Sequence, residues 1–414
     1  MYRALLASAN RLERQVRLIV PGPRYDVEDV GPFGRIYYVK APAAFAFDPR
    51  YRIILPSRYF LPAAHSVAGI LRAEQPDVVE ICDKFSLFYV AGLLRKEWMP
   101  GVRRPVLVGA SAERFDDGVG AFISRGERVQ RLARWYMRNI YTPMFDYHVA
   151  NSEYTAAELR DALPAHRQHV VHVCPPGVDL DGLDAVPLTP GGRSALRVRV
   201  GADARSVVLL YAGRLSPEKN VQLLIDLLAL LTASEERDRR NYRLVVAGDG
   251  PLLGRLRQEA EQRCPERVTF LGSVSDRAAY RTLLSAADFF VHPNPREPFG
   301  IAPLEAMAAG LPAVLPNAGG VLTYASEDTA WLAAPSANSF VRAIRDAVRQ
   351  PDVAAAKAVR ARRRAEALRF SDLFDRMFRL YDHFHQERIE AHAQHVLTAG
   401  LPIDRDRAQP VAGH

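Results

Sequence analysis

Cysteine is scarce in this sequence of 414 residues, and its three cysteines, Cys82, Cys174 and Cys264, lie far apart. Their number is odd and their spacing matches no metal-binding motif, so neither a disulfide framework nor a cysteine-based metal centre is expected. Such usage fits a reducing compartment, and we therefore expect a cytoplasmic protein.

Long apolar runs are missing as well. No stretch reaches the roughly 20 apolar residues that span a bilayer, and the N-terminus has no continuous hydrophobic segment of the signal-peptide kind. Walker, GxSxG, HExxH and CxxC patterns are absent, which argues against the nucleotidase, hydrolase, zinc-peptidase and redox classes they mark. The net charge of +8 suits anionic partners, namely nucleotide phosphates, acidic lipid headgroups or nucleic acid.

From Val207 onward, short β-rich runs alternate with longer helical ones. VVLLYAG precedes NVQLLIDLLALL, YRLVVAG precedes PLLGRLRQEAEQ, and DFFVHPN precedes APLEAMAAG. This alternation predicts βα units, hence a parallel sheet with helices on both faces. Ligands of such sheets bind beyond the carboxyl ends of the strands.

The first half is similar in kind, with strand candidates such as QVRLIVPG, GRIYYVKA, YRIILPS and RPVLVGAS. Their spacing again predicts a parallel sheet, and the chain length favours two domains facing a cleft. We expect an N-terminal domain over 1–185, a linker over 186–205, a second domain over 206–369, a helix over 370–396 that crosses back to the first domain, and a disordered tail over 397–414.

The opening of the chain is unusual for this fold class. A helical pattern, YRALLASANRLER, comes before the first strand candidate, whereas a doubly wound domain opens with a strand and a glycine-bearing turn. Either the sequence starts downstream of that strand, or the N-terminal domain lacks its first strand; in both cases we expect the strand to be missing from this chain. The alternative, an Arg-rich transit peptide over the first 24 residues, is disfavoured by the smooth join into QVRLIV.

The segment REPFGIAPLEAMAAG places Glu297 in a loop and Glu305 in the helix that follows. Pro298 and Gly300 interrupt regular structure, and Pro303 suits the first turn of a helix. The free N–H groups of such a helix start attract a phosphate, while the carboxylates can accept hydrogen bonds from sugar and ribose hydroxyls. The alternative is a buried helix with two solvated glutamates.

A second candidate phosphate site is GRLSPEKN, in which a strand ends at Gly213 and is followed by Arg214 and Lys219. Arg binds two oxygens in a fork and Lys acts as a point charge, so the pair can hold a diphosphate. By itself this could be a solvated surface pair. However, the Arg214 and Lys219 loop and the helix start after Glu297 both lie at the carboxyl ends of strands in one sheet.

Three other polar residues are interpreted as structural. Asp249 in AGDGP is explained by its turn, and His292 and His65 are lone histidines without matching partners, although His65 could approach a substrate at the cleft.

The motifs GRLSPEKN, VVAGDGP, VTFLGSVSD, AADFFVHPNPREPFGIAPLEAMAAGLPAV and NAGGV, in this order, resemble the retaining nucleotide-sugar glycosyltransferases of family 4, which have the GT-B fold. The resemblance is close over about Val207 to Val321. In the front half, DVVEICDKFSLFYVAGLLRK and SAERFDD resemble acceptor-domain segments of lipid- and glycan-mannosylating members more weakly.

The resemblance implies roles for the residues singled out above. Arg214 and Lys219 would bind the donor diphosphate and neutralise the leaving group, Glu297 would contact the donor sugar hydroxyls, and Glu305 the ribose. The remaining donor-binding residues would be Gly213, Leu271, Val274, Phe299, Gly300 and Ile301. The family typically needs no metal, so no cofactor is expected beside the UDP- or GDP-linked sugar.

Family members retain the anomeric configuration, and a donor phosphate oxygen is thought to take the acceptor proton. Glu297 would then orient the donor and would not act as a nucleophile. One departure concerns the front-domain loop, where many relatives have a histidine and this chain has Ala112. Together, Ala112 and the missing first strand raise the alternative of an impaired or non-catalytic nucleotide-sugar-binding protein.

The stretch 124–145 carries five arginines at helical spacing beside Trp135 and Tyr136: Arg125, Arg128, Arg131, Arg134 and Arg138. Such a helix could rest on an anionic membrane, or it could be an ordinary solvated face. A peripheral location on the inner face of the membrane is thus one expectation.

Three function classes follow: a hexosyltransferase of mannosyl or glucosyl type with a glycan or lipid acceptor, a non-catalytic nucleotide-sugar-binding protein, and a basic nucleic-acid binder. We favour the first. No nucleic acid is expected as a partner, because no recognition module is visible.

Overall fold

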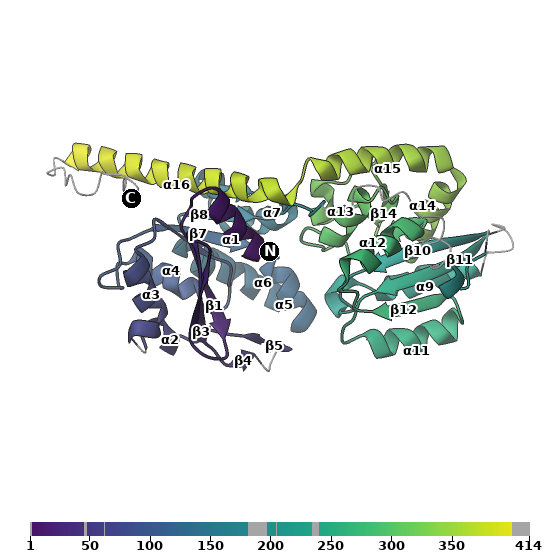
Figure 1. Cartoon of the computed structure of the whole chain (residues 1–414), viewed down its shortest axis with the longest axis horizontal. Helices are drawn as coiled ribbons and strands as arrows, with labels where there is room; N and C mark the ends of the chain where they lie inside the picture. Colours follow the sequence, from purple (N-terminus) through teal and green to yellow (C-terminus); the bar gives the residue numbers. More distant parts are fainter. Residues whose placement is uncertain are drawn as a thin grey trace.

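The computed structural model describes residues 2–44, 48–61, 63–180, 197–203, 205–233 and 240–399. The chain forms two α/β domains that lie side by side, and one long C-terminal helix runs from the second domain back along the first (Figure 1). Within the described residues, no helix combines the length and apolarity needed to cross a membrane.

The strands of the N-terminal domain are β1 (Val16–Gly22), β2 (Asp26–Val30), β3 (Gly34–Lys40), β4 (Ala43–Ala44), β5 (Asp48–Arg52), β6 (Val78–Ile81), β7 (Val106–Ser111), β8 (Tyr147–Ala150) and β9 (Val171–Val173). A four-stranded sheet has the order β6-β7-β8-β9 and is wholly parallel. A three-stranded sheet has the order β1-β3-β2, in which β1 runs parallel to β3. β4 and β5 form an antiparallel pair.

Two expectations for this domain need correction. The strand β2 was not expected, and it pairs with β3 antiparallel, so this sheet is not wholly parallel as predicted. Only the turn Gly31 to Phe33 separates the two strands, and a parallel connection needs a dozen or more residues. The expected strand YRIILPS is present only at its start. β5 ends at Arg52, and Pro56 then leads into a helix.

The helical elements of the N-terminal domain are α1 (Tyr2–Arg11), α2 (Ser57–Phe60), η1 (Ala63–His65), α3 (Val67–Glu74), α4 (Phe88–Arg95), α5 (Phe115–Phe122), α6 (Glu127–Tyr136), η2 (Met137–Tyr141), η3 (Thr142–Met144), α7 (Glu153–Ala162) and η4 (Ala165–Val170). α1 precedes β1, and its Leu6 and Ala9 are fully buried, so the opening residues belong to the packed domain.

The second domain has one sheet, made of β10 (Ser206–Ala212), β11 (Asn241–Ala247), β12 (Val268–Gly272), β13 (Phe289–Val291), β14 (Ala313–Pro316) and β15 (Trp331–Ala333). Its order is β12-β11-β10-β13-β14-β15, and every pair is parallel. The predicted parallel sheet of βα units is therefore confirmed. The direction of strand addition reverses between β10 and β13, which makes this the point where such sheets bind ligands.

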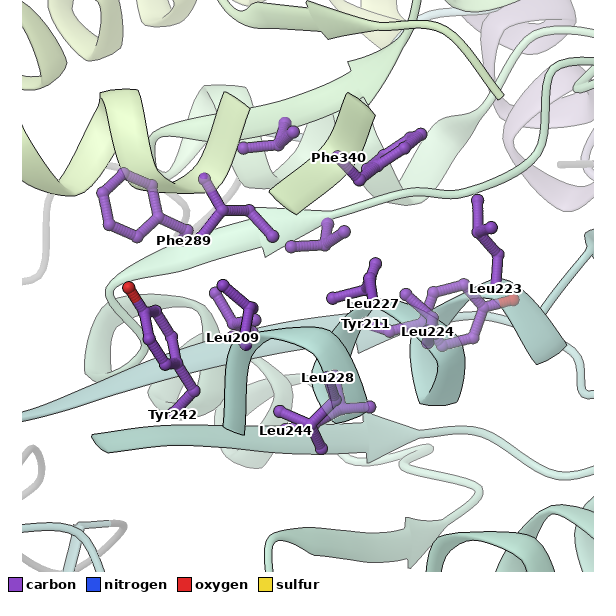
Figure 2. Close-up of a cluster of buried hydrophobic side chains, with 14 of the residues drawn as sticks. Leu209, Tyr211, Leu223, Leu224, Leu227, Leu228, Tyr242, Leu244, Phe289 and Phe340 are labelled. Atoms are coloured by element: carbon purple, nitrogen blue, oxygen red, sulfur yellow. The ribbon is translucent and has the colours of Figure 1, made fainter. Parts of the chain in front are cut away.

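Around this sheet lie η5 (Pro217–Lys219), α9 (Gln222–Thr232), α11 (Leu253–Arg263), α12 (Arg277–Ala286), α13 (Ile301–Ala308), η6 (Gly320–Thr323), α14 (Ala337–Arg349) and α15 (Pro351–Glu366). Figure 2 shows leucines of α9, including Leu224 and Leu228, packed beside Leu209 of β10 and Leu244 of β11. These side chains are at most 1% exposed. Their burial anchors β10, whose carboxyl end carries Arg214.

The chain crosses between the domains at two places that lie against each other. The Val178 N–H donates to the Leu368 carbonyl at 2.8 Å, and the Phe370 N–H donates to the Val178 carbonyl at 2.9 Å. From there α16 (Phe370–Ala399) runs along the N-terminal domain (Figure 1). Its fully buried Phe384 stacks on Tyr147 with ring centroids 4.0 Å apart.

Part of the expected domain division falls outside the described residues, namely 186–196 and 204 of the linker and 400–414 of the tail. Residues 397–399, which were expected in the tail, belong to α16.

Candidate active site

The loops after β10 and β13 meet at the carboxyl edge of the second sheet, because these two strands are neighbours. The first loop carries Arg214 and ends in η5 with Lys219; the second carries Glu297 and ends at Gly300, where α13 begins. The structure thus brings the two predicted phosphate-favouring features together at the point where the strand order reverses.

Glu297 is the centre of this site and is only 6% exposed. The Lys219 ammonium donates to its Oε1 at 2.8 Å and to its Oε2 at 3.0 Å. His292 Nε2 and Asn294 Nδ2 each lie 3.1 Å from Oε2. Since a carboxylate can only accept, His292 must carry its proton on Nε2.

The environment keeps Glu297 ionised. Burial disfavours its charge, but the hydrogen bond from His292 and the positive charge of Lys219 outweigh burial, so the pKa of Glu297 lies far below its usual range. Oε2 has three donors, whereas Lys219 is the donor to Oε1 among the described residues. The carboxylate is therefore a fixed anion with one oxygen more open to a further partner.

The start of α13 depends on Gly300. Its φ of 88° lies in the left-handed region, and an added Cβ would lie 2.8 Å from the Tyr324 hydroxyl. That hydroxyl donates to the Gly300 carbonyl at 2.6 Å. A side chain here would be strained by both conformation and space, so the residue between Phe299 and Ile301 must be glycine.

A second glycine lets two loops of the site touch. A Cβ at Gly320 would lie 1.8 Å from the Pro298 carbonyl oxygen, and the Gly320 N–H donates to the Glu297 carbonyl at 2.6 Å. The motif NAGGV thus holds the backbone of the Glu297 loop in place.

The other predicted donor-binding residues lie around this centre with different exposure. Phe299 is buried at 3% exposure, whereas Ile301 is 51% exposed at the start of α13. Leu271 and Val274 are partly buried against the core cluster that contains Phe299. They pack there, and in the described part of the chain neither of them bonds to Glu297.

Glu305 and Arg214 are placed by other contacts. Glu305 lies on α13, and burial raises its pKa. Arg214 follows Gly213, and its carbonyl accepts a hydrogen bond from the buried Tyr211 hydroxyl at 3.1 Å.

Sequence reasoning missed two residues of the site. His292 was interpreted as structural and Asn294 was not singled out, yet both are 3% exposed and bind Glu297. The signal was available: polar residues directly after a buried strand lie at the ligand edge of a parallel sheet. Asp249 keeps its turn interpretation, because its carboxylate accepts from the Gly250 N–H at 2.7 Å.

The N-terminal domain contacts the Glu297 loop directly. Ser152 Oγ, at the start of α7, donates to the Pro298 carbonyl at 2.5 Å, and Arg296 pairs with Asp117 of α5 at 3.2 Å. Ala112 follows β7 and is exposed; its carbonyl accepts from Asn151 at 2.7 Å. His65 stacks on Tyr25 with ring centroids 3.7 Å apart and makes no recorded contact with the Glu297 cluster.

Within the described ranges, no group of three or more His, Cys, Asp or Glu side chains is arranged to hold a metal ion. The polar atoms at the site are instead cationic and amide donors around one carboxylate.

Comparison with known proteins agrees with this arrangement. Residues 3–181 match the family model described as Glycosyltransferase Family 4, and residues 193–366 match the one described as Glycosyl transferases group 1. The GDP-mannose-dependent alpha-(1-6)-phosphatidylinositol dimannoside mannosyltransferase of Mycobacterium tuberculosis is 30% identical over 353 residues, which cover 85% of this chain and 83% of that protein.

Solved structures share the fold at lower identity. Sucrose-phosphate synthase from Thermosynechococcus elongatus aligns with a TM-score of 0.70 and 21% identity, covering 93% of this chain and 92% of that one. Anabaena Alr3699/HepE, in complex with UDP and glucose, aligns with a TM-score of 0.60 and 22% identity, covering 76% and 81%. The chain therefore belongs to the glycosyltransferases of family 4 and has the GT-B fold.

Proposed function

We propose that this glycosyltransferase moves a hexosyl group, of mannosyl or glucosyl type, from a nucleoside-diphosphate sugar to a glycan or lipid acceptor with retention of anomeric configuration. The observation that carries the proposal is the buried Glu297 carboxylate, held by Lys219, His292 and Asn294 beside the start of α13. Donor chemistry of this kind is supported by the mycobacterial relative, whose name specifies GDP-mannose.

Lys219 and Arg214 bind the donor diphosphate in this proposal. Lys219 now pairs with Glu297 and is 25% exposed in its side chain, so an incoming phosphate can share its charge. Arg214 adds a planar guanidinium in the same loop. Their positive charge stabilises the leaving diphosphate, which is the role a metal ion has in other transferases.

Glu297 acts as an orienting group. Its strongly lowered pKa makes it a weak base, so it suits accepting hydrogen bonds from sugar hydroxyls and not removing a proton. As the acceptor oxygen bonds to the anomeric carbon, the bond from that carbon to the donor phosphate oxygen breaks. The acceptor proton passes to the departing phosphate.

The acceptor side is the N-terminal domain. Leu132 and Trp135 are 63% and 53% exposed on α6, among the arginines of 124–145. An apolar and basic face of this kind suits an acceptor presented at an anionic membrane surface, from the cytoplasmic side. The relative named above acts on a phosphatidylinositol dimannoside, which is consistent with a lipid acceptor.

Nucleotide binding is tested by thermal shift with GDP, UDP, GDP-mannose and UDP-glucose. We expect at least one nucleoside diphosphate to raise the melting temperature, and Lys219→Ala and Arg214→Ala each to abolish that shift. Arg255→Ala is the matched control, since it removes an arginine of α11 with a side chain that is 72% exposed. The donor-site proposal is wrong if none of the four ligands shifts the wild-type protein.

The alternative, a non-catalytic nucleotide-sugar-binding protein, is favoured by Ala112 at the position where many relatives have a histidine. It predicts a normal thermal shift with neither hydrolysis nor transfer of the donor sugar. Release of nucleoside diphosphate from a donor that binds, lost in Glu297→Gln, would exclude it.

A further inference from the structure

A cavity lies on the N-terminal domain, away from the Glu297 cluster. It has a volume of about 520 Å³ and lies between α6 and α7, with the start of α5 at its base. Pockets that hold small molecules typically have volumes of 300–1,000 Å³. The cavity is therefore large enough for a phosphorylated small molecule or a lipid headgroup.

Three arginines of one helical stretch line this cavity: Arg131, Arg134 and Arg138. Their spacing, three and then four residues, places them on one face. All three are exposed, and among the described residues neither Arg131 nor Arg134 forms an ion pair. Arg138 donates to the Asp161 carbonyl at 3.2 Å, which leaves its charge without a carboxylate partner.

The acidic residues of the lining are mostly neutralised. Asp116 accepts two hydrogen bonds from Arg114, at 2.9 and 2.6 Å. Glu158 pairs with Lys84 at 3.3 Å and accepts from the Phe115 and Asp116 N–H groups.

Asp161 is the remaining carboxylate of the lining, against the three cations of α6 and η2. The hollow therefore carries excess positive charge on a concave surface, where field lines concentrate and an anion is favoured.

Trp135 also lines the cavity and is 53% exposed. An aromatic ring beside guanidinium groups offers an apolar flank to a ligand whose anionic part is held by the arginines. Guanidinium forks match phosphate oxygens in geometry.

We propose that this cavity is a binding site for a phosphate ester, either on a soluble molecule or in a lipid headgroup. It is distinct from the donor site, which lies on the second domain. One link between the two is the pair Asp117–Arg296, in which Asp117 follows the lining residue Asp116. The proposal does not depend on which nucleotide sugar, if any, is bound.

The alternative explanation is diffuse attraction of a basic helix to any anion, and a matched pair of variants separates the two. Arg131→Ala/Arg134→Ala removes two arginines of the lining, whereas Arg125→Ala/Arg128→Ala removes two exposed arginines of the same stretch outside the cavity. Both change the net charge equally. All four side chains are exposed, so both variants should fold, which circular dichroism and thermal melting check.

Two probes identify the source of the phosphate. Glycerol 3-phosphate is titrated by calorimetry, and vesicles of phosphatidylcholine with or without phosphatidylglycerol are tested by co-sedimentation. The cavity variant loses two charge-assisted hydrogen-bond donors, so we expect it to bind the preferred probe at least about tenfold more weakly. The control variant should differ from wild type by less than about twofold with glycerol 3-phosphate, and should weaken vesicle binding less than the cavity variant does.

Cavity-dependent binding of glycerol 3-phosphate assigns the site to soluble phosphate esters, and cavity-dependent binding of the anionic vesicles alone assigns it to a lipid headgroup. An equal loss in both variants would show diffuse electrostatics and overturn the proposal, as would no binding of either probe by the wild type. Nucleotide thermal shifts measured on the same variants stay unchanged, so a failure here is distinct from a failure of the donor site.

Discussion

His292 shows how a single buried side chain can set the behaviour of this site. Its ring donates to Glu297 Oε2 from one side, and Asn294 donates to the same oxygen from another. If Lys219 turns to a bound diphosphate, these two donors are what keeps the carboxylate in place. Oε1 then points to the space that Lys219 has left, where a sugar hydroxyl can donate to it.

We predict that His292→Leu lowers kcat roughly 10- to 100-fold, because a hydrogen bond to a charged group contributes about 1.5–3 kcal/mol. The KM for the donor should change much less, since Lys219 and Arg214 remain. Steady-state kinetics with the preferred donor measure both. His383→Leu, at an exposed histidine of α16, is the control. An unchanged kcat in His292→Leu would remove this role from His292.

His148 gives a pH dependence at the residue scale. It is fully buried in the N-terminal domain, with Nε2 3.3 Å from the Thr142 carbonyl, and burial lowers its pKa from 6.5 to about 3. The unfolded chain therefore binds a proton before the folded one does. The stability contributed by neutral His148 is complete above about pH 6.5 and is lost as the pH falls from there toward 3.

We predict that this histidine costs about 2 kcal/mol of stability at pH 5, since each pKa unit corresponds to 1.36 kcal/mol. His148→Leu should show a smaller drop in the urea midpoint between pH 7 and pH 5 than the wild type. His383→Leu should keep the wild-type drop. An equal drop in all three proteins would mean that other groups set the acid sensitivity.

The helix α16 links the two domains. It follows the last helix of the second domain in the chain, and its side chains pack on the first domain. Phe384 is buried among Val106, Val108 and Val149. Arg14 binds Asp382 in two contacts, at 2.9 and 2.6 Å, in which the side chains are each 49% exposed. The exposed ion pair adds little, so the aromatic contact is the stronger attachment.

We predict that Phe384→Ala loosens α16, because removing a buried Phe typically costs about 3–5 kcal/mol. Hydrogen exchange should become faster in α16 and in the strands beneath it, β7 and β8, while β10 and β11 keep their protection. Ile389→Ala, on the same helix and at a side chain that is 42% exposed, should leave exchange unchanged. Equal protection in Phe384→Ala and wild type would place the attachment elsewhere.

In the whole molecule, the two domains contact each other next to the predicted donor site. Ser152 and Asp117 of the first domain bind the backbone and side chain of the loop that carries Glu297. In the function proposed above, an acceptor on the first domain would thereby lie against a donor on the second.

The sequence alone determined the order of βα units and the parallel second sheet, because hydrophobic period and glycine and proline positions are local properties. Its motifs also determined the family and placed the loops of Arg214 and Glu297 at the same edge of that sheet. It missed β2, which a short turn pairs antiparallel with β3 in a half that was expected to be parallel. Only the tertiary structure decided which side chains surround Glu297. Lys219 is 78 residues away along the chain and reaches it because β10 and β13 are neighbours in the sheet. The cavity between α6 and α7 likewise exists only once packing has set two helices beside each other.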